Sequence, residues 1–117
     1  MDGCIFCKVA EGKIPSEKIY ENDSFFSVPD IKPVVKGHSL IISKKHFETS
    51  LNLPNSLGPE LLDCIKGTSL KLIDKYNADG FHITNNNFEA ANQIVKHVHF
   101  HILPRKKGDK NPLPRVL

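Results

Sequence analysis

The chain has 117 residues, enough for one domain and too few for a second hydrophobic core. Its hydrophobic fraction of 39% and charged fraction of 25% are those of an ordinary globular protein, which excludes a chain that is disordered throughout. No apolar run reaches the roughly 20 residues of a membrane helix, and the first residues lack a secretory signal, so we expect a cytoplasmic protein without a membrane partner. The net charge of +3 suits a phosphate-bearing ligand but does not predict specific nucleic-acid binding.

The first half of the chain predicts a short helix and three strands. A helix is expected over residues 5–12, because its pattern stops at Gly12, a residue that commonly ends helices. Segments rich in aliphatic, aromatic and β-branched residues, separated by turn residues, predict strands at 18–20, 25–28 and 38–43.

The only long helix is predicted from Leu57 to Asn77, where apolar residues recur at helical spacing. Ser56 is the expected N-cap, and Asp79-Gly80 should end the element. Gly67 in its middle costs about 1 kcal/mol relative to alanine, so it either allows a close approach to a sheet or is a weak point.

Two further strands are expected at 81–85 and 97–103, followed by a basic, proline-containing tail at 105–117. The connections between most strands contain no helix, which favours antiparallel pairing. We therefore predict an α+β fold in which residues 1–117 form a single domain, with about five antiparallel strands, one long helix and one short helix.

Three histidines alternate with apolar residues in the last predicted strand. Because strand side chains alternate between faces, His97, His99 and His101 should share one face, which must meet solvent, a ligand or a metal. The apolar residues between them should pack on the long helix. Two chemistries use such a group: a metal site with several histidine ligands, and a nucleophilic imidazole whose second nitrogen is held by a neighbour.

Two of the three cysteines form the pair Cys4-x-x-Cys7. In a chain without an export signal, this spacing indicates a metal or redox pair rather than a disulfide framework. A redox role is the weaker option, since no thioredoxin-like βαβ pattern follows the pair. The third cysteine, Cys64, lies on the long helix and is expected to be a buried apolar thiol.

The last strand closely resembles the signature of the histidine triad family, in which histidines alternate with hydrophobic residues. The matching stretch is Gln93-x-Val95-x-His97-Val98-His99-Phe100-His101-Ile102-Leu103-Pro104-Arg105. Upstream segments resemble the same family in the same order: Cys4-Ile5-Phe6-Cys7-Lys8, Gly12-Lys13-Ile14-Pro15, Tyr20-Glu21-Asn22-Asp23, Asp30-Ile31-x-Pro33 and Gly37-His38-x-Leu40-Ile41-Ile42-x-Lys44-Lys45-His46. This resemblance implies a nucleotide-binding α+β domain that works as a homodimer.

The family resemblance also implies a catalytic set. Family enzymes are nucleotidyl hydrolases and transferases in which the central histidine attacks the α-phosphorus and water hydrolyses the nucleotidyl-imidazole. By position His99 is the nucleophile, and His101 binds phosphate oxygens or orients the neighbouring imidazole. His38 matches a fourth active-site histidine of a hydrogen-bond relay. A neutral imidazole is a competent nucleophile near neutral pH.

A zinc site is implied by the same resemblance, which is strongest to the zinc-containing, Hint-like branch. The ligands would be Cys4, Cys7, His46 and His97, a Cys₂His₂ set that closes a tetrahedral zinc site. The alternative is a pair of free thiols near the terminus. If zinc is bound, the second ring nitrogen of His97 should link the metal to the active site.

The resemblance assigns a nucleotide pocket as well. Asp30 would bind the ribose hydroxyls, Asn86 a phosphate or the ribose, and Gln93 also belongs to the nucleotide-binding set. The base slot would be apolar, and an ordinary core role stays open for each of its four members: Ile5, Phe6, Ile31 and Leu40.

The segment before the last strand departs from the family pattern. Phe88 and Asn92 replace two glycines, and Ile94 replaces a serine or threonine whose hydroxyl would be a donor near the scissile phosphate. Asparagine tolerates positive φ, whereas phenylalanine does so poorly. Loss of one such donor can cost about 3–4 kcal/mol of transition-state stabilisation, so the rate or the substrate choice should be affected.

The favoured function is a zinc-containing purine nucleoside phosphoramidase that acts at the α-phosphate. One alternative is a dinucleoside polyphosphate hydrolase. Val95-Lys96-His97 resembles the sequence of that branch of the family locally, although the cysteine pair and Asn86 argue against it. The other is a nucleotide-binding or scaffolding dimer with little turnover, which Ile94 makes credible.

Overall fold

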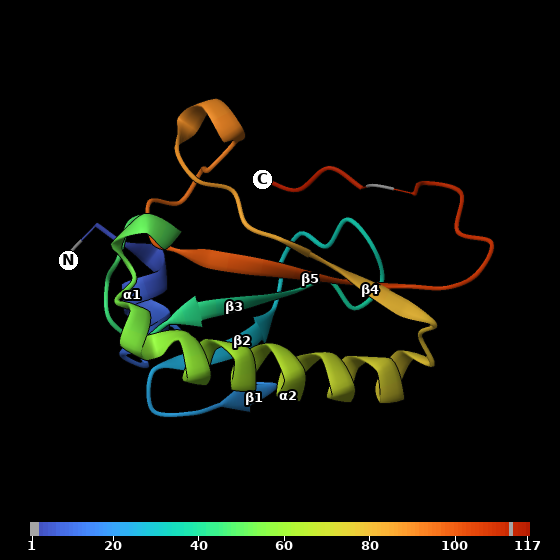
Figure 1. The fold of residues 1–117 in the computed structure, drawn as a ribbon, viewed down its shortest axis with the longest axis horizontal. Coiled ribbons are helices and arrows are strands. Elements are labelled where there is room, and N and C mark those ends of the chain that lie inside the picture. The colour runs from blue at the N-terminus through green and yellow to red at the C-terminus, as the bar shows by residue number, and fades with distance from the viewer. Residues whose placement is uncertain (1–2, 113) are drawn as a thin grey trace.

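The computed structural model describes residues 3–112 and 114–117, and a five-stranded antiparallel sheet forms its centre (Figure 1). The strands lie in the order β1-β2-β3-β5-β4, and every neighbouring pair is antiparallel. Their bounds are Tyr20–Glu21 for β1, Phe25–Pro29 for β2, Ser39–Ser43 for β3, Gly80–Thr84 for β4 and His99–Arg105 for β5. The predicted α+β class is confirmed.

The last strand is displaced by two residues from its predicted position. It begins at His99, because His97 lies in the bend that precedes the ladder with β3. It continues to Arg105, which pairs with Gly80 of β4. The expected basic tail therefore begins at Lys106 rather than at Arg105.

Helix α2, Gly58–Tyr76, covers one face of the sheet and makes the larger part of the core (Figure 1). The apolar side of β5 packs against it as predicted, together with buried residues of α2, β2 and β3: Phe25, Ile41, Cys64, Leu72, Val98, Phe100 and Ile102. Among the described residues, no helix has the combined length and apolar character needed to cross a membrane.

Both ends of α2 differ from the sequence prediction. Ser56 is not the N-cap, because it lies inside a 3₁₀ turn, Asn55–Leu57, that runs directly into the helix. At the other end, Asn77 adopts the left-handed conformation with φ of 51°, and its N–H donates to the carbonyl of Ile73. The helix therefore ends before Asp79-Gly80, and Gly80 starts β4 instead.

The opposite face of the sheet is covered by the short helix α1, Ile5–Ala10. A second, smaller apolar cluster lies there, formed by Phe26, Val28, Leu40 and Ile42 with Phe6, Val9 and Ala10. Leu40 pairs with His101 and Ile42 pairs with His99, and directly paired residues share a face of an antiparallel sheet. The two β5 histidines therefore lie on the α1 side, away from α2.

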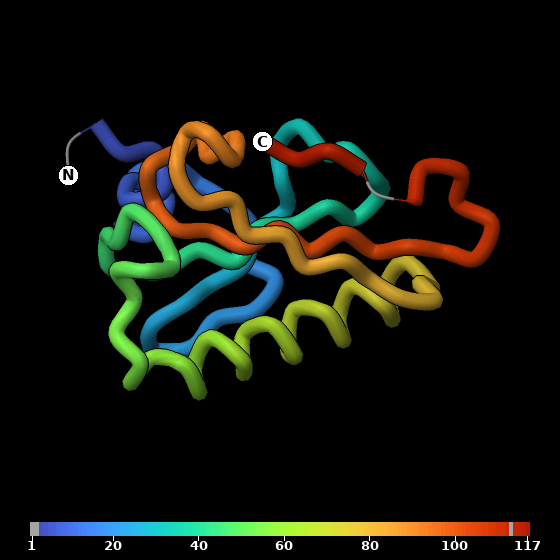
Figure 2. Tube along the Cα trace, turned by 45° about the horizontal axis from the view of Figure 1, so that its top comes forward, coloured from blue at the N-terminus to red at the C-terminus, as the bar shows by residue number. Residues whose placement is uncertain are grey.

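The C-terminal segment returns toward the loop that follows β4, as Figure 2 shows. Val116 is buried, and its carbonyl accepts a hydrogen bond from the Asn86 side-chain amide at 3.2 Å. Pro114 is also buried. The end of the chain thus contributes to the packing beside the β4–β5 connection.

Gly67 allows α2 to approach β1 closely, as one of the two sequence hypotheses proposed. A Cβ atom at this position would lie 2.3 Å from the ring of Tyr20, whose hydroxyl donates to Asp63 Oδ2 at 2.9 Å. We expect Gly67→Ala to lower the free energy of unfolding by about 1–2 kcal/mol, because overpacking outweighs the gain of about 1 kcal/mol in helix propensity.

Gly58→Ala is the matched control for this prediction, since a Cβ on Gly58 at the start of the same helix meets nothing within 4 Å. Urea unfolding of both variants and the parent measures the difference. A Gly67→Ala variant as stable as Gly58→Ala would contradict the close approach of the helix to Tyr20.

Candidate active site and metal centre

A cluster of buried histidines lies between the sheet and α1. His38 directly precedes β3, and His99 and His101 project from β5; all three are at most 3% exposed. The ring of Phe6 from α1 packs edge-on against the ring of His99, with 5.0 Å between the ring centroids. The histidine face of β5 is therefore covered by protein rather than open to solvent.

Three hydrogen-bonding groups in series fix the tautomers of His38 and His101. The backbone N–H of Val34 donates to His38 Nδ1 at 3.1 Å, so the proton of the neutral ring must be on Nε2. That Nε2 lies 2.8 Å from His101 Nδ1 and donates to it. The proton of His101 is therefore on Nε2, which is buried and has no partner among the described residues. This N–H is a free donor inside the site.

His99 is held in the complementary tautomer. Its Nδ1 lies 2.7 Å from the backbone carbonyl oxygen of His97, and only a protonated Nδ1 can donate to that oxygen. Nε2 then carries the lone pair. The side-chain amide of Asn85 donates to the His99 carbonyl at 2.9 Å and fixes the backbone there. The Nε2 lone pair of His99 therefore has the chemistry of a nucleophile, and the N–H donor of His101 is on a ring 5.1 Å away between centroids.

Burial keeps these imidazoles neutral. It lowers the pKa of His101 to about 3, with a further contribution from the neighbouring His99 and His38. Burial likewise lowers the pKa of His38 and of His99, although the Asp30 carboxylate opposes the effect at both. At neutral pH all three rings are uncharged, as the chain of hydrogen bonds requires.

The predicted zinc ligands converge at the end of the sheet beside α1. The ligand atoms of Cys4, Cys7, His46 and His97 all lie within 4.8 Å of one another. Cys4 Sγ is 3.2 Å from His97 Nδ1, and Cys7 Sγ is 3.3 Å from His46 Nδ1. Tetrahedral zinc separates sulfur and nitrogen ligand atoms by about 3.5 Å, so this group fits a single ion.

His97 presents the correct nitrogen to this group. Its Nε2 lies 2.8 Å from the carbonyl oxygen of Ser43 and donates to it, which leaves the lone pair on Nδ1 beside the two sulfur atoms. The second ring nitrogen therefore contacts Ser43 and not the active site, contrary to our expectation. The link to the active site runs instead through the backbone carbonyl of His97, which orients His99.

A second cluster of possible ligands consists of Asp30, His38 and His101. Its two imidazole nitrogens are only 2.8 Å apart, a hydrogen-bond distance and shorter than two nitrogen ligands of one ion would allow. Asp30 Oδ2 lies 3.3 Å from His38 Nε2, whose proton is donated to His101 Nδ1. We interpret this group as the hydrogen-bond relay.

The residues expected to form the base slot occupy two environments. Leu40 and Phe6 are part of the smaller apolar cluster, which matches the core alternative for Leu40. Ile31 and Ile5 are exposed, at 88% and 45%. Asp30 lies beside His38, with 3.3 Å between Oδ2 and Nε2, and its Oδ1 accepts from the Lys32 N–H.

The amide of Gln93 is used inside the loop before β5. Its Nε2 donates to the carbonyls of Glu48 and Val95, and its Oε1 accepts from the Phe88 N–H at 2.8 Å. Asn86 Nδ2 contacts the carbonyls of Asn92 and Val116. The hydrogen bonds of both amides to backbone groups thus hold the conformation of this loop.

Phe88 and Asn92, which stand where the family pattern has glycine, both adopt positive φ. Asn92 has φ of 67° in the left-handed region that asparagine tolerates, whereas Phe88 has φ of 70° with ψ of 160°. The latter conformation is nearly restricted to glycine and costs about 1–3 kcal/mol for other residues. The loop is therefore strained at Phe88.

We expect Phe88→Gly to raise the free energy of unfolding by about 1 kcal/mol, because the relieved strain exceeds the entropy that glycine adds to the unfolded chain. The ring of Phe88 is 57% exposed, so little packing is lost. Phe88→Ala keeps a Cβ at positive φ and should give no gain. Urea denaturation measures both, and equal effects of the two variants would contradict the strain.

Sequence reasoning missed the groups that orient the histidines. Ser43 and Val34 act through a backbone carbonyl and a backbone N–H, which no side-chain pattern reveals. Asn85 was expected to end a strand, and its amide instead supports His99. Its position directly after β4, facing β5, was the only available signal.

The comparison with known families agrees with this site. The sequence matches the HIT domain family over residues 11–108, and the chain belongs to this family. It is 44% identical over 108 residues to an uncharacterized HIT-like protein of Methanocaldococcus jannaschii, and the match covers 91% of this chain and 81% of the relative. It is 38% identical over 107 residues to an adenosine 5'-monophosphoramidase, HNT1, of Candida albicans, and that match covers 88% of this chain and 70% of the relative.

Solved structures show the same fold. A Streptococcus mutans protein superimposes with a TM-score of 0.89 at 37% identity, and the match covers 100% of this chain and 74% of the other chain. A Zn-bound histidine triad family protein of Mycobacterium smegmatis superimposes with a TM-score of 0.87 at 32% identity, covering 98% and 84%.

Proposed function

We propose that this protein hydrolyses purine nucleoside phosphoramidates at the α-phosphate through a nucleotidyl-His99 intermediate. One observation carries the proposal: the hydrogen bond from His99 Nδ1 to the His97 carbonyl leaves Nε2 free to attack, and the unpartnered Nε2–H of His101 lies on the adjacent ring. The likeness to a monophosphoramidase supports the same substrate class.

The reaction would proceed in two displacements. His99 Nε2 attacks the α-phosphorus, the P–N bond breaks, and the leaving nitrogen takes a proton from solvent water and departs as the amine. Water then attacks the phosphorus of the intermediate, releasing the mononucleotide and the free imidazole. The N–H of His101 stabilises the negative charge on the phosphate oxygens, and His38 keeps that N–H in place through its hydrogen bond to His101 Nδ1.

Zinc would be held by Cys4, Cys7, His46 and His97, whose spacing fits a closed tetrahedral set. A bound zinc ion supplies folding free energy and no part of the hydrolysis, since all four positions are filled by protein. The likeness to a Zn-bound family member supports this metal. By fixing His97, the site also fixes the carbonyl that orients His99.

The nucleotide would lie on the α1 side of the sheet, between α1 and the segment after β2. Asp30 would accept hydrogen bonds from the ribose hydroxyls, and the exposed Ile5 and Ile31 would offer apolar surface to the base. Asn86 and Gln93 would position the loop beside the phosphate. Ile94 is 65% exposed and adds no donor there, so turnover should be slower than in a relative with a hydroxyl.

Parallel assays of adenosine 5'-phosphoramidate and a dinucleoside polyphosphate on the purified protein test the proposal. We expect cleavage of the P–N bond and little cleavage of the polyphosphate. The reverse preference would favour a polyphosphate hydrolase. Binding of AMP without hydrolysis of either compound would favour the nucleotide-binding or scaffolding dimer.

We also propose a homodimer formed through β4. This strand lies at the end of the sheet order, so its outer edge has no strand partner among the described residues, and its Phe81 and Ile83 are 39% and 47% exposed. Sedimentation at micromolar concentration should show a species of twice the chain mass. Ile83→Glu should convert it to monomer, whereas Leu51→Glu, at a residue 79% exposed, should not. A parent protein that sediments only as monomer would contradict the proposal.

A further inference from the structure

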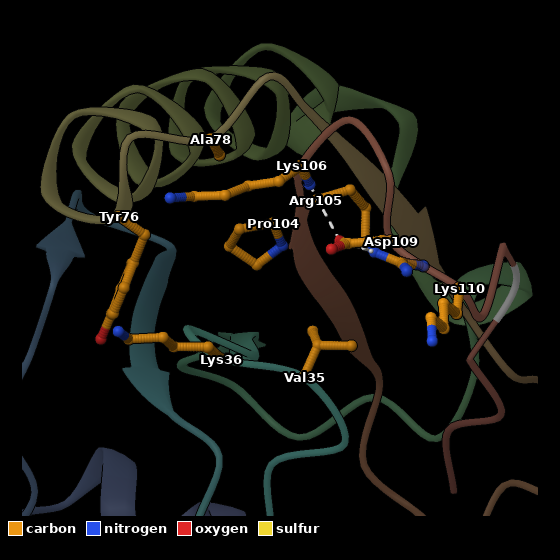
Figure 3. A pocket seen from close by; sticks show the side chains of 9 residues that line it. All are labelled: Val35, Lys36, Tyr76, Ala78, Pro104, Arg105, Lys106, Asp109 and Lys110. Carbon is orange, nitrogen blue, oxygen red and sulfur yellow. Dashed lines mark hydrogen bonds and ion pairs between the residues drawn. The ribbon is translucent and has the colours of Figure 1, made fainter.

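A hollow lies near Arg105, at the end of β5 opposite His99, and shares no residue with the histidine cluster (Figure 3). Its volume is about 410 Å³. It lies between the segment before β3, the end of α2 and the turn after β5, and is lined by Val35, Lys36, Tyr76, Ala78, Pro104, Arg105, Lys106, Asp109 and Lys110.

The charge of this hollow is strongly positive. Its only carboxylate, Asp109, accepts hydrogen bonds from Arg105 Nε at 3.0 Å and from the Lys106 N–H at 2.9 Å, so Arg105 neutralises it. The ammonium groups of Lys36, Lys106 and Lys110 have no carboxylate within 4 Å in the part of the chain that the structure describes. Three positive charges without a carboxylate partner therefore belong to the lining of one hollow, and Figure 3 shows those of Lys36 and Lys106 on the Tyr76 side and that of Lys110 on the opposite side.

The floor of the hollow is apolar. Figure 3 shows the ring of Pro104 between Lys106 and Lys36, with the ring of Tyr76 on one side and Val35 opposite Pro104. A ligand that combines an anionic group with a flat or aliphatic body matches this combination of lysines and apolar rings.

Both walls are held in place before any ligand binds. Gly37 has φ of 85°, and a Cβ there would lie 2.8 Å from the ring of Tyr76 and 3.0 Å from Pro104, so glycine allows the Lys36 wall to pack closely. On the other side, Arg105 also donates to the carbonyl of Asn111, which fixes the turn that carries Lys106. Preorganised walls lower the entropy cost of binding.

We propose that this hollow binds a small organic phosphate, with the phosphate between Lys36 and Lys106, whose ammonium groups both lie on the Tyr76 side in Figure 3, and the organic body against Tyr76 and Pro104. The site is separate from the proposed active site and does not depend on its activity. A compact phosphate ester fits better than an extended polyanion, because Lys36 and Lys106 extend to the same side of one hollow instead of forming a stripe along the surface.

Titration of the ¹⁵N-labelled full chain with phenyl phosphate, followed by amide chemical shifts at constant ionic strength, tests the proposal. We expect saturable shifts at Gly37, Ala78 and Lys106, and tighter binding of phenyl phosphate than of inorganic phosphate. The double variant Lys36→Gln/Lys106→Gln should weaken the binding by about tenfold or more. It leaves the histidines and the cysteine pair untouched.

Lys8→Gln/Lys66→Gln is the control, because it removes the same charge from exposed positions outside the hollow. It should leave the affinity within about twofold. The proposal is overturned if the lining amides show no saturable shift, if inorganic phosphate binds as tightly as the ester, or if the control weakens binding as much as the hollow variant. Shifts confined to amides around His99 would equally overturn it and would assign the ligand to the active site instead.

Discussion

Replacement of His99 by alanine should reduce kcat for a nucleoside phosphoramidate by at least about 10³-fold while the fold and the metal content stay intact. The reason is geometric: His99 is the ring whose Nδ1 is held by a backbone carbonyl and whose Nε2 is left with a lone pair. Val98 and Phe100 anchor its strand on the α2 side of the sheet, so truncation of the imidazole should not displace β5. Steady-state kinetics, circular dichroism and elemental analysis measure the three quantities.

Neighbouring histidines provide the controls for this experiment. His101→Ala should keep part of the activity, since this residue supports the phosphate and does not attack it. His97→Ala should lose the metal and stability, because its Nδ1 faces the two cysteines. His99→Gly should be partly rescued by a nucleoside phosphorimidazolide, which already carries an imidazole. Near wild-type turnover by His99→Ala would show that the nucleophile is elsewhere or is water.

Removal of one predicted metal ligand is expected to have the second large effect. The purified protein should contain about one zinc per chain, and Cys7→Ser should lose it and lower the free energy of unfolding by about 3 kcal/mol or more. Cys7 is buried and joins α1 to the end of the sheet through His46 and His97, so the loss should loosen the N-terminal segment as well.

Cys64→Ala is the matched control for the metal. This third thiol belongs to α2 and is buried against the other face of the sheet, so the variant should lose core packing but keep its full zinc content. Inductively coupled plasma mass spectrometry and urea unfolding read the two effects separately. Protein purified without chelator that contains no zinc, or a Cys7→Ser variant with unchanged zinc, would contradict the site.

Much of the fold could be predicted from short-range patterns. Alternation in β5 placed Phe100 and Ile102 on the α2 side, and apolar residues at helical spacing gave α2 within one residue at each end. The convergence of Cys4 and Cys7 with His46 required the resemblance to a known family, because ligands so far apart in sequence have no local pattern.

Other features depended on long-range contacts and escaped the sequence. His97 was expected in the strand, but its ring donates to Ser43 O and its Nδ1 faces the cysteines, and these contacts hold it in the bend before β5. Serine is a common N-cap residue, yet Ser56 lies inside the 3₁₀ turn before α2 and does not cap the helix. Backbone groups such as the Val34 N–H select the tautomers of the site and carry no side-chain signature.

Capture of the covalent intermediate tests the central claim most directly. Rapid acid-free quenching of the wild-type protein with adenosine 5'-phosphoramidate, followed by proteolysis and mass spectrometry at neutral or alkaline pH, should find one adenylyl group on the peptide that carries His99. The same peptide of His99→Ala should remain unmodified. Turnover without any adenylyl-peptide, together with inversion of configuration at a chiral α-phosphorus, would indicate direct attack by water and contradict the account.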